Sequence, residues 1–351
     1  MNRGEYIVEP DDPILITGAG GFIGMRVVRT LLRYGFRNLR CFARGSGDAL
    51  RSLAAATPDA RIEVMEGNLL YEEDCERAVR DARVIYHLVA GKDKSFASCI
   101  LNGVVTTRNL LDAVVKAGAI RRFVNVSAFD VYSNWNLKRG ALMDESSALD
   151  DRILERADAP GYAKLKQDEV VLDYSSRYQI PFVMLRPCSV YGAGWPQPPS
   201  RVGLGTFGIY LHIGGGNRLP LTYVDNCAEA IALAGLREGV DGEVFNVVDD
   251  DLPTSRQFLR AFKKNGRSFW SIYVPYRVFY VFCYLWELYS RRSEGQLPMA
   301  FNRRRCDYYW RGNRYSNKKL KDRLGWKPSV SFPEASRRFF EYVREAGEDH
   351  A

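Results

Sequence analysis

The feature that most restricts the fold of this chain is a glycine-rich segment between an apolar run and an amphipathic stretch. Ile14–Ile16 predicts a buried strand, Thr17–Gly24 reads TGAGGFIG, and the next residues have the apolar spacing of a helix. A turn without side chains lets a pyrophosphate approach the backbone and the unpaired N–H groups at the positive end of the helix dipole. The order strand, turn and helix therefore predicts a dinucleotide site, with much better specificity than a glycine pattern alone.

Short apolar runs alternate with helical patterns up to about Pro187, which indicates a parallel sheet with crossover helices. We expect an α/β fold, a Rossmann-type doubly wound parallel sheet with a smaller, interleaved C-terminal substrate domain. Residues 1–187 would bind the dinucleotide, with 221–248 returning to that domain, and 188–220 and 249–351 would bind substrate. The expected strands are Ile14–Thr17, Leu39–Ala43, Arg61–Glu66, Val84–Leu88, Phe123–Ser127 and Phe182–Arg186. The expected helices are Phe22–Tyr34, Tyr71–Val79, Cys99–Ala117 and Tyr162–Tyr178.

Composition excludes several other classes of protein. The net charge of +8 suits an anionic ligand, but no helix-turn-helix, zinc-finger or RNA-binding signature accompanies it, so we expect no nucleic-acid partner. The seven cysteines show no C-x-x-C spacing, which is typical of a reducing compartment, and we expect no metal site. Met1–Pro13 contains four acidic residues and no apolar core of a signal peptide, so we expect a cytoplasmic protein.

Tyr276–Tyr289 is an aromatic stretch that Arg291 and Arg292 follow closely. It is shorter than the roughly 20 apolar residues that span a bilayer. Our preferred interpretation is a packed helix that covers a substrate pocket. The alternative is a helix in a membrane interface, which would give the protein a peripheral membrane contact.

Tyr162 and Lys166 begin a long helical pattern and are four residues apart, so a helix places them on one face. An adjacent ammonium favours the ionised form of a phenol and lowers its pKa. The pair predicts a proton donor and acceptor for the interconversion of an alcohol and a ketone.

At this point the chain resembles the extended short-chain dehydrogenase/reductase family, the NAD(P)-dependent epimerase/dehydratase group that includes the sugar-nucleotide epimerases. The resemblance covers nearly the whole chain. It rests on motifs in the family's order: Thr17–Gly24, Gly67–Leu69, Tyr86–Ala90, Asn102 with Thr106 and Asn109–Leu111, Val126–Ser127, Tyr162–Lys166, Leu185–Gly192, Tyr223–Ala230 and Leu324–Pro328.

The resemblance implies roles for individual residues. Tyr162 and Lys166 would be catalytic, Lys166 would also hold the nicotinamide ribose, and His87 would be structural. Helices Cys99–Ala117 and Tyr162–Tyr178 would pair across the two-fold axis of a homodimer. The expected cofactor-binding residues are Gly18, Gly21, Phe22, Ile23, Gly24, Asn68, Leu69, Leu88, Val89, Ala90, Lys166, Pro187 and Val190.

Two departures from the family pattern change these expectations. Members that prefer NAD usually end the second strand with an acidic residue that binds the ribose 2′-OH. Here Ala43 and Arg44 stand at that place, which favours the 2′-phosphate of NADP, with NAD as the alternative. The usual catalytic Ser or Thr falls on Ala128, and we nominate the neighbouring Ser127 as the third catalytic residue.

For substrate, Arg218 stands where the family's sugar-nucleotide enzymes place an arginine on the pyrophosphate, and Arg304 is a second candidate. Ser189 replaces an asparagine that often helps to hold the sugar nucleotide. The first hypothesis is therefore an oxidoreductase or epimerase that interconverts hydroxyl and keto groups on a nucleotide sugar. The alternatives are an NADPH-dependent reductase or dehydrogenase of a lipophilic, sterol-like or polyprenyl-linked alcohol, and a dinucleotide-binding scaffold without turnover.

Overall fold

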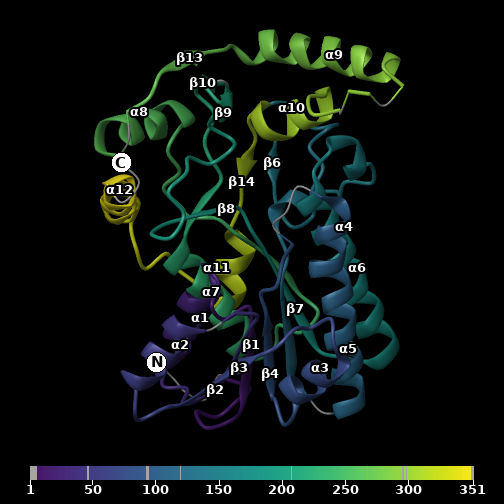
Figure 1. Ribbon diagram of the computed structural model, residues 1–351, viewed down its shortest axis with the longest axis vertical. Helices are drawn as coiled ribbons and strands as arrows, with labels where there is room; N and C mark the ends of the chain where they lie inside the picture. The colour runs from purple at the N-terminus through teal and green to yellow at the C-terminus, as the bar shows by residue number, and fades with distance from the viewer. Residues whose placement is uncertain are drawn as a thin grey trace.

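The computed structural model describes residues 6–45, 47–91, 95–118, 120–206, 208–266, 268–294, 296–297 and 299–348. Its centre is a seven-stranded parallel sheet in the order β12-β7-β5-β4-β1-β2-β3 (Figure 1). The expected α/β fold with a parallel Rossmann-type sheet is confirmed. The strands are β1 (Ile14–Thr17), β2 (Asn38–Ala43), β3 (Arg61–Glu66), β4 (Val84–His87), β5 (Arg122–Val126), β7 (Phe182–Pro187) and β12 (Val244–Val247).

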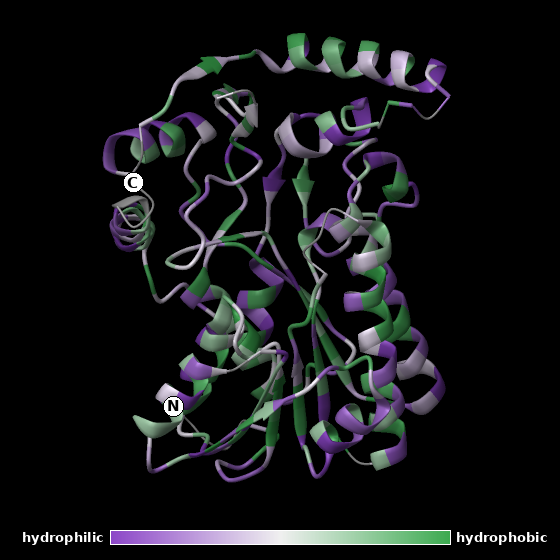
Figure 2. Ribbon diagram, in the orientation of Figure 1, coloured by the Kyte–Doolittle hydropathy of each residue, from purple (hydrophilic) through white to green (hydrophobic). Residues whose placement is uncertain are grey.

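The side chains of the central strands alternate between two hydrophobic cores, one on each face of the sheet. Ile14 and Ile16 belong to the core under one layer of helices, whereas Leu15 belongs to the core under the other. Every residue of β1, β4, β5 and β7 is buried, as a parallel sheet covered on both faces requires. Figure 2 shows the hydrophobic colour along these strands.

Two layers of helices cover the sheet. The layer on the first core comprises α1 (Gly24–Arg33), α2 (Asp48–Ala55), α7 (Val224–Leu236) and α11 (Lys318–Leu324). The opposite layer comprises α3 (Glu72–Val79), α5 (Thr106–Ala117) and α6 (Ala159–Tyr178). The two layers lie on the two sides of the sheet in Figure 1.

The expected continuous helix Cys99–Ala117 is wrong in detail. The structure divides this region into α4 (Phe96–Cys99), a π-helix (Ile100–Val105) and α5. The wider turns of a π-helix are common at functional sites, and here they carry Asn102, a residue of the site described below. A hydrophobic period does not distinguish the two helix types, because both bury one side of the segment.

The remaining elements lie beyond the carboxyl ends of the sheet strands, in the upper part of Figure 1. β10 pairs with β9 and β13, β8 pairs with β11, and β6 pairs with β14. The strands are β6 (Leu142–Met143), β8 (Ser189–Tyr191), β9 (Gly203–Thr206), β10 (Ile209–His212), β11 (Leu221–Tyr223), β13 (Ser271–Tyr273) and β14 (Arg314–Tyr315). The helices are α8 (Ser255–Asn265), α9 (Tyr276–Arg292), α10 (Arg303–Trp310) and α12 (Phe332–Glu348), with 3-10 turns at Phe129–Val131 and Ile153–Arg156.

Helix α7 packs against β4 so closely that Gly235 has no room for a side chain. A Cβ built at Gly235 would lie 2.2 Å from the hydroxyl oxygen of the buried Tyr86, which donates a hydrogen bond of 2.8 Å to the Ala232 carbonyl. We expect Gly235→Ala to lower the free energy of unfolding by about 1–3 kcal/mol, because the clash outweighs the better helix propensity of alanine. Urea denaturation would measure this loss.

The matched control is Gly216→Ala. Gly216 is exposed, and a Cβ there would meet no atom within 4 Å. We expect that variant to stay within about 0.5 kcal/mol of the wild type. Equal stability of the two variants would contradict this account of the packing.

Candidate functional site

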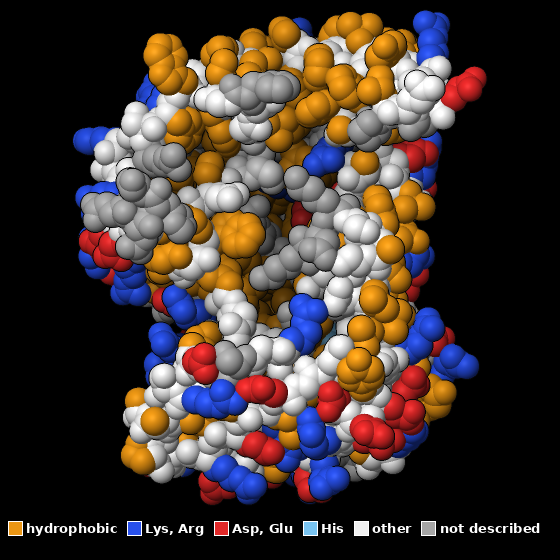
Figure 3. Space-filling view, in the orientation of Figure 1, with side chains coloured by type: hydrophobic (Ala, Val, Ile, Leu, Met, Phe, Trp, Pro, Cys, Tyr) orange, Lys and Arg blue, Asp and Glu red, His pale blue; other side chains and the backbone are white. Residues whose placement is uncertain are grey.

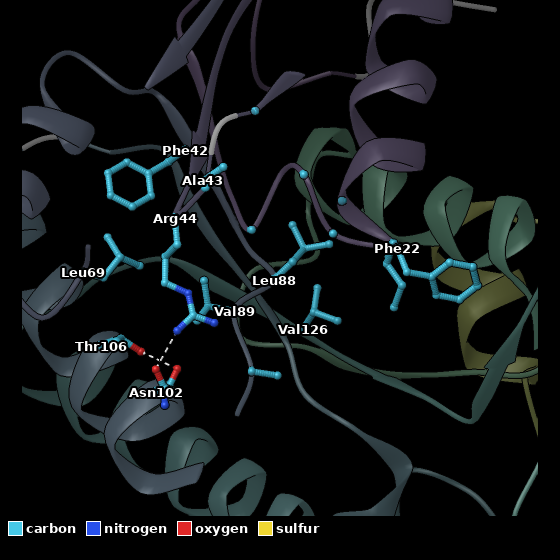
Figure 4. Close-up of a pocket in the computed structure, with 18 of the residues that line it drawn as sticks. Phe22, Phe42, Ala43, Arg44, Leu69, Leu88, Val89, Asn102, Thr106 and Val126 are labelled. Atoms are coloured by element: carbon cyan, nitrogen blue, oxygen red, sulfur yellow. Dashed lines mark hydrogen bonds between the residues drawn. The ribbon is translucent and has the colours of Figure 1, made fainter. Parts of the chain in front are cut away.

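A cavity of about 700 Å³ lies over the carboxyl ends of the central strands, where doubly wound sheets bind their ligands. We call it the main cavity. Figure 4 shows side chains from the ends of β2, β4 and β5 and from the π-helix converging on it. The described residues that line it are Gly18, Gly20–Gly24, Phe42–Gly45, Gly47–Leu50, Asn68, Leu69, Leu88–Ala90, Asn102, Thr106, Val126, Ser127, Lys164, Val190 and Trp195.

The glycine-rich turn forms one wall of the main cavity from bare backbone. Gly18 has φ +73°, which favours glycine, and it follows β1 directly. A Cβ at Gly24 would lie 2.1 Å from the Gly18 carbonyl oxygen, and one at Gly21 would lie 3.1 Å from it. Helix α1 begins at Gly24, directly after this turn, so the positive end of its dipole lies at this wall. This wall fits a pyrophosphate.

Arg44 lies at the end of β2 and reaches toward the π-helix. Its Nη1 donates a hydrogen bond of 2.7 Å to Asn102 Oδ1, and Thr106 donates to the Asn102 carbonyl (Figure 4). Asp48 is the carboxylate among the described lining residues, and it forms an ion pair with Arg51. A cation that is exposed, near an apolar floor and beside a glycine-rich turn can bind a phosphate.

Most of the other expected cofactor residues line the main cavity, and two do not. Phe22, Ile23, Asn68, Leu69, Leu88, Val89, Ala90 and Val190 all lie in it. Pro187 ends β7 outside the lining, and Lys166 is absent from it.

The structure does not bring Tyr162 and Lys166 to the main cavity, so their expected placement is wrong. Both line a separate pocket of about 450 Å³ between the π-helix, α5 and α6. Lys166 Nζ forms an ion pair with Glu169 at 2.7 Å, and the Tyr162 ring packs on Phe96 with centroids 5.7 Å apart. The two residues do share one helix face, as expected, but that face points away from the sheet.

Lys164 is the lysine of α6 that lines the main cavity. Its Nζ donates hydrogen bonds to the Val126 carbonyl at 2.6 Å, to Gln167 Oε1 at 2.7 Å and to the Val89 carbonyl at 3.2 Å. Burial lowers the pKa of Lys164 to about 8. The amine is therefore held at the ends of β4 and β5 with a pKa below that of a free lysine.

The residue four positions before Lys164 is Pro160, in the exposed first turn of α6. A tyrosine that paired with Lys164 on the same helix face would stand there. Asp158 caps the helix by accepting a hydrogen bond from the Gly161 N–H, and proline suits the first turn because its missing N–H would be unpaired there. The main cavity therefore contains a lysine without the usual tyrosine.

Ser127 lies in the main cavity just beyond the end of β5. Its hydroxyl donates a hydrogen bond of 2.9 Å to Asp168 Oδ2, which also accepts from Arg186 Nη2 at 3.1 Å. Desolvation raises the pKa of the buried Asp168 carboxyl, against the opposing charge of Arg186. The nominated hydroxyl is thus oriented by a buried carboxylate one turn after Lys164.

His87 has the structural position that we expect for it. Its Nδ1 and Nε2 lie 2.8 Å from the hydroxyls of Thr17 and Thr107, and burial lowers its pKa to about 3. Thr107 donates its proton to the Gly103 carbonyl, so the histidine carries its proton on Nε2 and accepts from Thr17 on Nδ1. The ring stays neutral and joins β1 to α5.

A second pocket of about 940 Å³ adjoins the main cavity and shares Val190 and Trp195 with it. Ser189 lines this pocket, together with residues of β9, β10 and α8. No charged side chain occurs among its described lining residues. Apolar, hydroxyl and amide side chains therefore line this space beside the main cavity.

The two arginines expected at the substrate lie elsewhere. Arg218 lines a different pocket, between α8 and the start of α12, and donates to the Leu252 carbonyl at 2.9 Å. Arg304 is buried and pairs with Asp150 at 2.8 Å. Neither residue lines the pocket that contains Ser189, so their expected placement at a common substrate site is wrong.

Sequence reasoning missed Lys164, Asn102 and Trp195 as site residues. For Lys164 the sequence contained a weak signal, because Lys164 and Asp168 are four residues apart and a helix places both on one face. No local pattern marks Trp195, which reaches the cavity from the loop after β8. Among the described residues, no cluster of His, Cys, Asp and Glu has the geometry of a metal site.

Comparisons with known proteins show the family of this chain. The model of the NAD dependent epimerase/dehydratase family matches residues 14–247. Low-salt glycan biosynthesis protein Agl12 of Haloferax volcanii is 29% identical over 269 residues, which are 71% of this chain and 82% of that protein.

Two solved structures show the same fold. UDP-glucuronic acid 4-epimerase from Bacillus cereus in complex with NAD has a TM-score of 0.70 at 20% identity, over 95% of this chain and 99% of that one. UDP-glucose 4-epimerase from Thermotoga maritima with UDP-glucose has a TM-score of 0.69 at 22% identity, over 95% and 99% of the two chains. Since the family model spans more than half of the sequence, this chain belongs to the NAD dependent epimerase/dehydratase family and is an enzyme of the extended short-chain dehydrogenase/reductase type.

Proposed function

We propose that this enzyme binds NADP(H) in the main cavity and interconverts a hydroxyl and a keto group on a nucleotide sugar. The observation that carries the proposal is the cavity itself, with a bare glycine wall, Arg44 at one end and Lys164 with Ser127 at the other. The two solved structures named above are UDP-sugar 4-epimerases, and this likeness supports the substrate class. In this proposal residues 1–187 and 221–248 hold the cofactor, and 188–220 and 249–351 hold the substrate.

The cofactor preference rests on the end of β2. Ala43 cannot accept a hydrogen bond from a ribose hydroxyl, whereas the guanidinium of Arg44 can bind a 2′-phosphate. Asn102 holds Arg44 at the cavity and would release it to the phosphate. NAD is the alternative, and Asp48 would then be the ribose acceptor.

A bound nicotinamide would supply hydride transfer, and the chain must move the proton. We propose that Lys164, in place of Tyr162, exchanges that proton at Nζ, because its lowered pKa leaves both protonation states accessible near neutral pH. Ser127 would orient the reacting oxygen through its hydroxyl, which Asp168 positions. This arrangement replaces a tyrosine–lysine pair by a lysine and a serine.

A second substrate class is favoured by the pocket beside the main cavity. A nucleotide pyrophosphate needs cationic partners, and the described lining of this pocket has none. The enclosing side chains, among them Leu204, Tyr210 and Phe269, suit a lipophilic alcohol. The scaffold hypothesis has no such support, because Lys164 lies in the cavity with a titratable amine.

We also propose a cytoplasmic homodimer that pairs through the α5–α6 face. Leu101, next to α5, is exposed, and the pocket that contains Tyr162 and Lys166 is lined by side chains from both helices and from the π-helix before α5. Interface packing would give that exposed tyrosine–lysine pair a structural use.

The first prediction concerns the cofactor. We expect Arg44→Ala to weaken NADPH binding at least tenfold and to leave NADH binding within about twofold, because only NADPH carries the 2′-phosphate. Fluorescence titration would measure both affinities. Arg80→Ala, an exposed arginine outside the cavity, is the matched control. Equal wild-type affinities for the two cofactors would contradict the assignment.

The second prediction separates the two lysines of α6. We expect Lys164→Met to weaken NADPH binding at least tenfold and to abolish turnover, whereas Lys166→Met loses only an exposed ion pair and stays within about twofold. In the wild type the dissociation constant should rise as the pH passes about 8, because the charged amine donates hydrogen bonds and the neutral one does so poorly. Lys164→Met should lack this dependence. The reverse ranking of the two variants would restore Tyr162 and Lys166 as the catalytic pair.

The substrate class can be tested without knowing the product. A ligand that binds only the folded state raises the unfolding midpoint. With saturating NADPH, we expect at least one of the UDP, dTDP and GDP sugars to raise the midpoint further, as followed by differential scanning fluorimetry. A rise with a polyprenyl or sterol alcohol, and none with any nucleotide sugar, would establish the second substrate class instead.

A further inference from the structure

We propose that α9 and β13 form a docking surface for the headgroup region of an anionic phospholipid bilayer. In the part of the chain that the structure describes, no helix is long and apolar enough to cross a membrane. Helix α9 would therefore lie on the surface of the bilayer. This inference is independent of the proposed reaction.

Helix α9 has a face that the rest of the protein leaves uncovered. Its residues Val278, Val281, Leu285, Leu288 and Tyr289 are all exposed, with Leu285 57% exposed, and Phe282 at the edge of this face is 42% exposed while its ring packs on Phe301. At 100° per residue these positions fall within an arc of about 120°. We call this arc the α9 apolar face. It forms the outer edge of the molecule at the top of Figure 3.

The opposite side of α9 packs against the rest of the protein, and this packing holds the helix in place. The Phe279 ring meets Trp310 of α10 edge to face, with centroids 5.2 Å apart, and Trp286 meets Phe301 in the same way at 5.5 Å. Cys283 is buried in the same cluster. The helix is thus apolar on both sides, and only one side has a partner within the described residues.

Charge is distributed around α9 as an anionic surface would require. Glu287 is the single acidic residue of the helix, and it is 6% exposed, facing Arg303 at 3.0 Å and Arg291 at 2.6 Å. The exposed charges of α9 are Arg277 near its start and Arg291 and Arg292 at its end. Cations at both ends of an apolar arc match anionic headgroups on either side of a shallow insertion.

The segment before α9 adds aromatic side chains of the kind that favour a membrane interface. Trp270 is 85% exposed, and Ile272 and Tyr273 of β13 are also exposed. Tyrosine and tryptophan combine an apolar ring with a polar group, which suits the boundary between headgroups and acyl chains. Helix α9 lies at the extremity of the ribbon, where a flat lipid surface can reach it (Figure 1).

Co-flotation with vesicles tests the proposal on the full chain. We expect the wild type to bind vesicles of phosphatidylcholine with 30% phosphatidylglycerol, on the order of tenfold more weakly when the anionic lipid is omitted. The double variant Val281→Asp, Leu285→Asp should bind the anionic vesicles at least tenfold more weakly. Arg277→Glu, Arg292→Glu should bind them more weakly at low salt and equally at high salt. Leu154→Asp, an exposed leucine outside this surface, is the matched control.

Each variant is checked for folding by its unfolding midpoint and for cofactor binding by NADPH titration. Absence of wild-type flotation with anionic vesicles would overturn the proposal. So would a wild type that light scattering shows to be a dimer and that Val281→Asp, Leu285→Asp converts to a monomer without flotation in either state, because a second copy would then cover the face. Equal weakening by Leu154→Asp would also overturn it.

Discussion

The buried carboxylate of Asp168 connects α6 to the carboxyl ends of β5 and β7, beside the main cavity. It accepts hydrogen bonds from Asn125 of β5, from Ser127 beyond that strand and from Arg186 of β7. Each contact joins α6 to a different part of the sheet edge. Removal of this carboxylate would leave Arg186 buried without its anion, which is far more costly than the loss of a surface ion pair. These three hydrogen bonds therefore fix the rotation of α6 about its own axis, because another rotation would break them.

That rotation decides which lysine can act. Lys164 is four residues before Asp168 and shares its side of the helix, so it reaches the carbonyls at the ends of β4 and β5. Lys166 is rotated by about 200° from Lys164 and faces outward with Glu169. Gln167 links Lys164 to the Thr107 hydroxyl and so to the neutral His87. A structural histidine and a catalytic candidate thus belong to one buried polar network.

The outer surfaces of the protein contrast with this closed network. The central strands bury their apolar side chains on both faces, while α9 buries one side and leaves a second apolar side uncovered. A large contiguous apolar patch on the surface of a protein commonly marks an interaction site. The apolar pocket beside the main cavity lies in the same upper part of the molecule, between β10 and α8. A lipid surface at α9 and a lipophilic substrate would fit together, although neither requires the other.

The sequence by itself determined the dinucleotide fold. Short apolar runs, turns after them and the spacing of Gly18, Gly21 and Gly24 are local properties, and the limits of β1 to β5 and of β7 agree with the predicted ones within two residues. Most of the cofactor wall could be predicted for the same reason, since these residues directly follow strands. Only the tertiary structure decided the orientation of α6, the position of Arg218 and Arg304 outside the main cavity and its neighbouring pocket, and the exposure of one face of α9. Those outcomes depend on partners distant in sequence, such as Arg186 for Asp168 and Asp150 for Arg304, and no periodicity within one segment can specify which of its faces such partners will bury.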